Sequence, residues 1–198
     1  MSMVAKGLPD TGIAATGPAI AEAFFAAFRH HPAGVAIIAA DAGEGPVALT
    51  VSSLISISAA PPMVAFSLSA SSSSAKVIER AASVVIHFVR RPDMQLARLC
   101  ATSGKDRFGP DVRWGRLDSG EPYYPEVALW FRAELRGRLE TPNACLVTAE
   151  LTSVSPGEHA TAQAEALVYS NRAWHGLGPV VDTVSAPVLL WPDDSATF

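Results

Sequence analysis

The chain has 198 residues, of which 49% are hydrophobic and 17% are charged, and its formal net charge is −4. This composition is sufficient for one buried core and excludes disorder throughout the chain. The small negative charge creates no basic field of the kind that attracts nucleic acid or anionic membranes, so we expect neither as a partner.

The two cysteines, Cys100 and Cys145, stand far apart and have no CxxC spacing. Disulfide scaffolds and structural zinc sites need paired or clustered cysteines, so we expect no metal site and a reducing, cytoplasmic location. No apolar run approaches the roughly 18 residues of a membrane span, and the first residues lack a continuous signal-peptide core.

The first elements follow from local patterns. Residues 1–17 are small and aperiodic, which predicts a flexible N-terminal arm. Residues 18–31 carry four large apolar side chains at helical spacing, and Pro32 ends the predicted helix. The apolar run 34–41, the turn-prone DAGEGP and the extended segment 47–58 predict a β-hairpin.

The later elements alternate between strands and short helices. Strands are predicted at 61–69, 84–89, 128–141 and 145–155, helices at 73–83 and 93–103, a Gly/Pro-rich loop at 104–127, and a strand with a turn at 165–178. Such a pattern is typical of a mainly β protein with short helices that forms a closed or partly closed barrel. We expect one domain at 18–178 and a C-terminal tail at 179–198.

Serine is unusually abundant between residues 45 and 78 for strand-like sequence. A buried hydroxyl without a partner costs about 1–3 kcal/mol, so these side chains need an explanation. One interpretation is a single strand with one solvated face, because Thr50, Ser52, Ser56 and Ser58 share one parity.

The other interpretation is a ligand site. The serine run 71–74 lies at the start of the predicted helix, and Ser73 or Ser74 is in the right place for the helix N-cap, where serine is favoured in any protein. A helix start also offers free backbone N–H groups, and here it adds several hydroxyls and Lys76 in its first turn. That combination suits a phosphate, and the hydroxyl-rich strand before it suits the polar edge of a planar ligand attached to that phosphate.

Several segments taken together resemble the short-chain flavin reductase family between Pro32 and Leu177: PAGVAIIAA, GPVALTVSSLISISAAPPMVAFSLSASSSSAKVI, DRFG, EPYY and ALVYSNRAWHGL. The resemblance implies an FMN-binding split β-barrel that forms a homodimer. It also implies hydride transfer from NADH or NADPH to FMN or FAD, with reduced flavin passing to a flavin-dependent monooxygenase.

The resemblance further implies a set of cofactor-binding residues. Those implied for the flavin ring and ribityl are Thr50, Val51, Ser52 and Ser53, with Ser56 facing the ribityl or the phosphate. Those implied for the phosphate are Ser72, Ser73, Ser74 and Lys76. Those implied near the cofactor or the dimer partner are Arg107 and Phe108.

Two positions depart from the family pattern. Ala60 replaces the Asp before the Pro pair, and the Gly-Asp-His element of the nicotinamide site falls on Pro142–Ala144 in the register that we favour. His159, in a GEH sequence, is then a solvated turn residue, and His175 is a second candidate for the nicotinamide site. Direct hydride transfer between cofactors needs no acid–base residue of the protein, so none is assigned.

Two alternatives remain open at this point. One is an oxidoreductase that keeps flavin bound and acts on another small molecule. The other is a non-catalytic flavin-binding or flavin-storage protein, which the altered Gly-Asp-His position keeps open.

Overall fold

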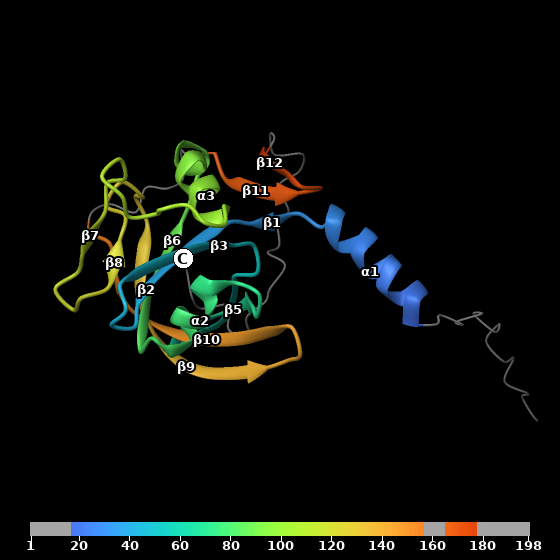
Figure 1. Ribbon diagram of the computed structural model, residues 1–198, viewed down its shortest axis with the longest axis horizontal. Helices are drawn as coiled ribbons and strands as arrows, with labels where there is room; N and C mark the ends of the chain where they lie inside the picture. The colour runs from blue at the N-terminus through green and yellow to red at the C-terminus, as the bar shows by residue number, and fades with distance from the viewer. Residues whose placement is uncertain (1–16, 157–164, 178–198) are drawn as a thin grey trace, which may run out of the picture.

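A computed structural model of the chain describes residues 17–156 and 165–177 (Figure 1). The predicted tail 179–198, almost all of the predicted arm, and His159 lie outside the described residues. The helices are α1 (Gly17–His30), α2 (Ser73–Arg80) and α3 (Met94–Ala101), with a 3-10 turn, η1, at Arg91–Asp93. None of the described helices is long and apolar enough to cross a membrane.

Strands make up most of the remaining regular structure, which confirms the mainly β class. They are β1 (Ala33–Gly34), β2 (Ala36–Asp41), β3 (Pro46–Val51), β4 (Ile55–Ala59), β5 (Pro62–Ser69), β6 (Ser83–Phe88), β7 (Gly115–Arg116), β8 (Pro122–Tyr123), β9 (Trp130–Glu140), β10 (Ala144–Val154), β11 (Leu167–Ser170) and β12 (Ala173–Gly176).

Seven of these strands form one antiparallel sheet in the order β3-β2-β6-β9-β10-β5-β4. Although β3 and β4 are consecutive in sequence, they form its two opposite edges. The sheet curls so that β3 contacts β5. The Ser53 hydroxyl joins the two sides, since it accepts the Ser67 N–H at 2.9 Å and donates to the Ser67 carbonyl at 3.2 Å.

Two cores lie on opposite faces of this curled sheet. Alternate residues of β2 serve each of them: Ala36, Ile38 and Ala40 belong to the core shared with β5, β10 and α2. Ile37 and Ala39 belong to a second core, formed with α3 and β11. Because both faces of β2 are covered, its sequence is a continuous apolar run and does not alternate.

The prediction of one strand over 47–58 is wrong. β3 ends at Val51 and β4 begins at Ile55, and the residues between them cross from one edge of the sheet to the other. Thr50 and Ser58 therefore lie on strands at opposite edges, and equal parity no longer places them on one solvated face. The hairpin of β2 and β3 is confirmed.

Smaller differences concern element ends. The run 34–41 divides into β1 and β2, which belong to different sheets. Helix α2 ends at Arg80 because Ala81 has extended backbone angles. The predicted loop 104–127 contains the short β7–β8 ladder.

Helix α1 projects from the body of the molecule (Figure 1) and has no buried residue. Phe24, Phe25 and Phe28 are 52%, 66% and 62% exposed. The end of the helix is attached to the β11–β12 hairpin, where the Asn171 N–H donates to the Arg29 carbonyl at 2.5 Å. A short helix gains its stability from packing its apolar face, so this face requires a partner surface.

Candidate functional site

The serine run opens α2 as the sequence predicts. Ser72 is the N-cap, and its hydroxyl accepts the Ala75 N–H at 3.3 Å. The first N–H groups of a helix have no partner within the helix. Ser73 and Ser74 supply these groups, and the Ser73 hydroxyl makes no hydrogen bond to the described residues. The helix start is therefore a place where an anionic oxygen can accept hydrogen bonds.

The end of β3 lies beside this helix start. Figure 1 shows β3 between α2 and α3, and both helices contact it. The Thr50 hydroxyl donates to the Ala97 carbonyl of α3 at 2.7 Å. Ser53 bridges to β5, whereas Ser52 is exposed and has no hydrogen bond within the described part of the chain. Thr50 and Ser53 therefore use their hydroxyls to fix the end of β3 against α3 and β5.

Arg107 supplies a cation beside the first turn of α2. Its guanidinium donates from Nη1 to the Ser74 hydroxyl at 2.9 Å and from Nη2 to the Thr102 carbonyl at 2.9 Å. Its Nε is buried and has no partner among the described residues. A charged N–H of this kind favours an anionic acceptor nearby.

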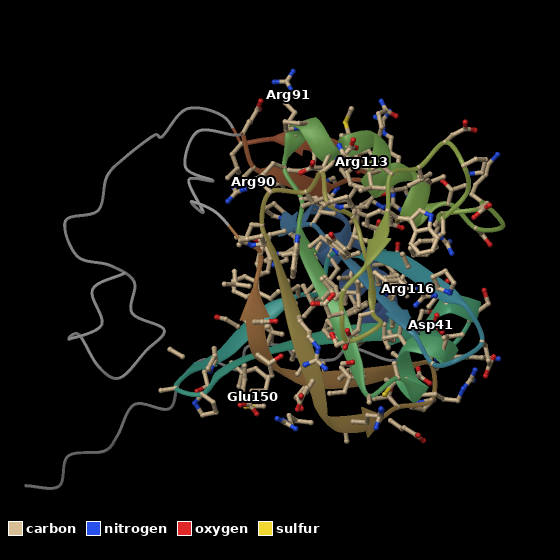
Figure 2. All side chains as sticks on the ribbon, turned by 90° about the vertical axis from the view of Figure 1, so that its left-hand side faces the viewer. Asp41, Arg90, Arg91, Arg113, Arg116 and Glu150 are labelled. Carbon is tan, nitrogen blue, oxygen red and sulfur yellow. The ribbon has the colours of Figure 1, made fainter. Side chains whose placement is uncertain are left out.

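The segment that carries Arg107 is held by ion pairs at its far end. Arg116 lies beside Asp41 (Figure 2), with 2.6 Å between its Nη2 and the carboxylate. Burial raises the pKa of Asp41, but hydrogen bonds from Arg116 and from two backbone N–H groups outweigh it and hold that pKa below its usual value. Glu121 is 5% exposed and pairs with Arg132 at 2.8 Å, which joins the segment to β9.

The start of α2, the end of β3 and Arg107 surround one polar cleft of about 700 Å³, within the usual size range of small-molecule sites. The predicted residues that line it are Thr50, Val51, Ser52, Ser53, Ser72, Ser73, Ser74 and Arg107. A larger hollow of about 990 Å³ lies between α1 and β4, where Phe25, Phe28 and Ile55 make it mainly apolar. We place the candidate site in the smaller cleft because hydroxyls, a helix start and a cation meet in its lining.

Other predicted residues lie outside the lining of the cleft. Ser56 is exposed on β4, beyond the crossing at 52–54. Lys76 is exposed on α2. Phe108 packs into the second core against Trp114 and Tyr124, at ring-centroid distances of 5.1 and 5.5 Å.

His175, His87 and Cys100, which lines the cleft, have distinct surroundings. His175 is exposed on β12, and its Nε2 lies 3.0 Å from the Ser170 carbonyl. His87 is buried, with Nδ1 3.2 Å from the Ile37 carbonyl and Nε2 accepting the Tyr124 N–H at 3.0 Å. Burial raises the pKa of the Cys100 thiol to about 11, so it is no nucleophile at neutral pH.

The sequence interpretation missed part of the lining. Ser67 and Ser69 share one face of β5, so the period-two pattern of that strand contained a signal for them. Asn143 had no such signal. It reaches the cleft because β10 pairs with β5 and its carbonyl accepts the Ala70 N–H at 3.0 Å.

Fold and site together define a mainly β protein whose serine-lined cleft, helix start and arginine suit a phosphorylated planar ligand. A model of the flavin reductase like domain matches residues 28–178. The chain belongs to this family, which confirms the resemblance found in the sequence.

Individual relatives agree with this assignment. An NADH:FMN oxidoreductase of Rhodococcus qingshengii is 34% identical over 155 residues, which are 78% of this chain and 81% of the relative. The crystal structure of a flavin reductase domain protein from Arthrobacter sp. FB24 matches with a TM-score of 0.75 and 29% identity, over 83% of this chain and 99% of that one. A nitrilotriacetate monooxygenase component B homolog from Mycobacterium thermoresistibile shares the fold, with a TM-score of 0.74 at 20% identity, over 92% and 98% of the two chains.

Proposed function

We propose that the chain is a cytoplasmic NAD(P)H-dependent flavin reductase that transfers hydride from a nicotinamide to FMN or FAD. As a member of the flavin reductase like family it is an oxidoreductase that uses a flavin and NADH. The single observation that carries the proposal is the cleft in which the start of α2, the Arg107 guanidinium and several hydroxyl side chains come together.

The residues of the cleft fit a phosphorylated flavin. Thr50, Val51, Ser52 and Ser53 line the part assigned to the ring and ribityl. The phosphate end consists of Ser72, Ser73, Ser74 and Arg107. Arg107 already donates to Ser74 and retains a buried Nε–H for an anionic oxygen. Lys76 and Ser56, from outside the lining, remain proposed contacts: Lys76 adds positive charge near the phosphate, and Ser56 faces the ribityl or phosphate.

The protein's own contribution is binding and orientation. A bound flavin supplies a hydride acceptor, which needs no nucleophile or acid–base pair from the chain. The raised pKa of Cys100 agrees with that, because a protonated thiol does not attack a ligand. His175 and His159 remain the candidates for contact with the nicotinamide.

The test is loss of the nicotinamide absorbance band when purified protein is mixed with NADH or NADPH and with FMN, FAD or riboflavin. We expect oxidation above the flavin-only control. Arg107→Gln should raise the KM for FMN about tenfold, because hydrogen bonds between charged groups are among the strongest in proteins. Arg113→Gln is the matched control, since Arg113 is exposed and contacts Glu126 at 3.7 Å, outside the cleft.

Other outcomes of this assay identify the alternatives. Flavin binding without any nicotinamide oxidation indicates a non-catalytic flavin-binding protein. Oxidation that requires an added organic acceptor indicates an enzyme that keeps flavin bound and acts on another small molecule. No flavin binding at all overturns the proposal.

The proposed assembly is a homodimer of split β-barrel domains, each comprising residues 18–178. The exposed aromatic face of α1 supports it, because a second copy of the chain would bury Phe24 and Phe28. Sedimentation velocity should give a dimer for the native chain and a monomer for the double variant Phe24→Glu, Phe28→Glu. A native monomer would refute this assembly.

The proposed role is that of the reductase component for a flavin-dependent monooxygenase. The likeness to the monooxygenase component B homolog motivates it, and the open cleft allows flavin to leave after reduction. Catalytic amounts of the protein should therefore reduce many equivalents of free FMN. Reduction of a single equivalent that stays bound contradicts a carrier role.

A further inference from the structure

Tyr124 is buried completely and is fixed to the sheet through its backbone. Its N–H donates to Nε2 of His87 at 3.0 Å, and Nδ1 of His87 lies 3.2 Å from the Ile37 carbonyl. His87 and Ile37 are paired on the neighbouring strands β6 and β2, and both are fully buried. The position of Tyr124 is therefore set by a buried strand pair of the sheet.

The side chain of Tyr124 extends from this anchor to the loop that carries Arg107. Its hydroxyl donates to the Arg107 carbonyl at 3.1 Å and also lies 3.5 Å from the Cys100 Sγ. Its ring stacks on Phe108, with 5.5 Å between centroids and 12° between planes. Burial raises the pKa of Tyr124, so the hydroxyl stays protonated and keeps its donor at physiological pH.

The Arg107 loop depends on this contact. The neighbouring side chains of Lys105 and Asp106 are exposed, and Arg107 lies in neither a helix nor a strand. Within the described ranges, the main chain of Arg107 is hydrogen-bonded to the second core through its carbonyl, which accepts the Tyr124 hydroxyl. The Arg107 side chain then spans to Ser74, at the start of α2.

We propose that Tyr124 is a positioning residue for phosphorylated flavins: its hydroxyl holds the Arg107 main chain where the guanidinium reaches both Ser74 and the ligand's phosphate. This inference rests on the proposed function, in which Arg107 contacts that phosphate. It assigns a buried side chain outside the cleft lining to ligand selectivity. FMN binding depends on Tyr124, whereas binding of riboflavin, which lacks the phosphate, does not.

The test compares the Kd values of FMN and riboflavin for the full chain and for Tyr124→Phe, measured by quenching of flavin fluorescence. The FMN Kd should rise about fivefold, the effect of losing the hydrogen bond to the Arg107 carbonyl, while the riboflavin Kd and kcat at saturating FMN stay unchanged. Tyr123→Phe is the matched control, because the Tyr123 hydroxyl makes no hydrogen bond to the described residues. Equal weakening for both flavins, or an unchanged FMN Kd, overturns the inference.

Arg107→Gln separates this inference from the proposed function. In that background Tyr124→Phe should not weaken FMN binding further, because the hydroxyl acts through Arg107. If Arg107→Gln weakens FMN binding and Tyr124→Phe does not, the inference alone fails. If the native chain binds FMN and riboflavin equally and Arg107→Gln changes neither, the assigned phosphate end is wrong, and both proposals fall.

Discussion

Acid should destabilise this fold through a single buried histidine. His87 donates through one ring nitrogen and accepts through the other, so it is neutral in the folded chain. Burial lowers its pKa from 6.5 to about 4. The unfolded chain therefore takes up the proton first, and stability that is complete above pH 6.5 is lost as the pH falls toward 4.

The size of the pKa shift of His87 determines how much unfolding free energy is lost in acid. The free energy of unfolding should fall by about 2 kcal/mol between pH 7 and pH 5, and by about 3 kcal/mol by pH 4, from His87 alone. Urea unfolding followed by tryptophan fluorescence at fixed protein concentration measures this dependence. The comparison needs a variant that lacks only this proton site.

His87→Gln is that variant, since an amide offers one donor and one acceptor but does not titrate. The native chain should lose stability faster than His87→Gln as the pH falls from 7 to 4. If the free energy of unfolding of the two proteins falls in parallel with pH, His87 does not carry the acid sensitivity. The assignment of a neutral imidazole that is hydrogen-bonded through both ring nitrogens would then be refuted.

Three further outcomes follow from the same contacts. Ser53→Ala should lower the free energy of unfolding by about 1 kcal/mol, seen as a lower urea midpoint, because both bonds to the Ser67 backbone are lost; an unchanged midpoint contradicts the bridge. Glu121→Gln should cost about 2 kcal/mol and leave Arg132 with Glu134 as its remaining charge partner, and a Tm equal to that of the native chain would exclude the pairing with Glu121. Lys76→Ala should raise the FMN Kd less than Arg107→Gln, since Lys76 is exposed. A larger effect of Lys76→Ala in FMN titrations would show that the phosphate binds closer to Lys76 than to Arg107.

Local patterns predicted most of the secondary structure. Apolar side chains at helical spacing indicated α1, and DAGEGP between two extended runs indicated the β2–β3 hairpin. The serine run does cap α2, although the N-cap is Ser72 and the sequence suggested Ser73 or Ser74, which lie in the first turn. Each of these features depends on neighbours within a few residues along the chain, where backbone preference and side-chain spacing decide the outcome.

Contacts between distant segments were not accessible in the same way. Arg107 reaches Ser74 across 33 positions, and Thr50 reaches the Ala97 carbonyl across 47. Both contacts depend on where α3 lies against β3. The sequence resemblance placed Arg107 near the cofactor, but only the fold showed that its guanidinium bonds to the first turn of α2.

By itself, the sequence determined the mainly β class, the hairpin, the helix starts and an unusual supply of hydroxyls. The tertiary structure alone decided that the chain leaves β3 at Val51 and re-enters the sheet at its other edge, which keeps Ser53 in the lining of the cleft and places Ser56 outside that lining. The physical reason is that periodicity records which face of an element is buried, whereas strand order depends on which strands pair across the whole chain.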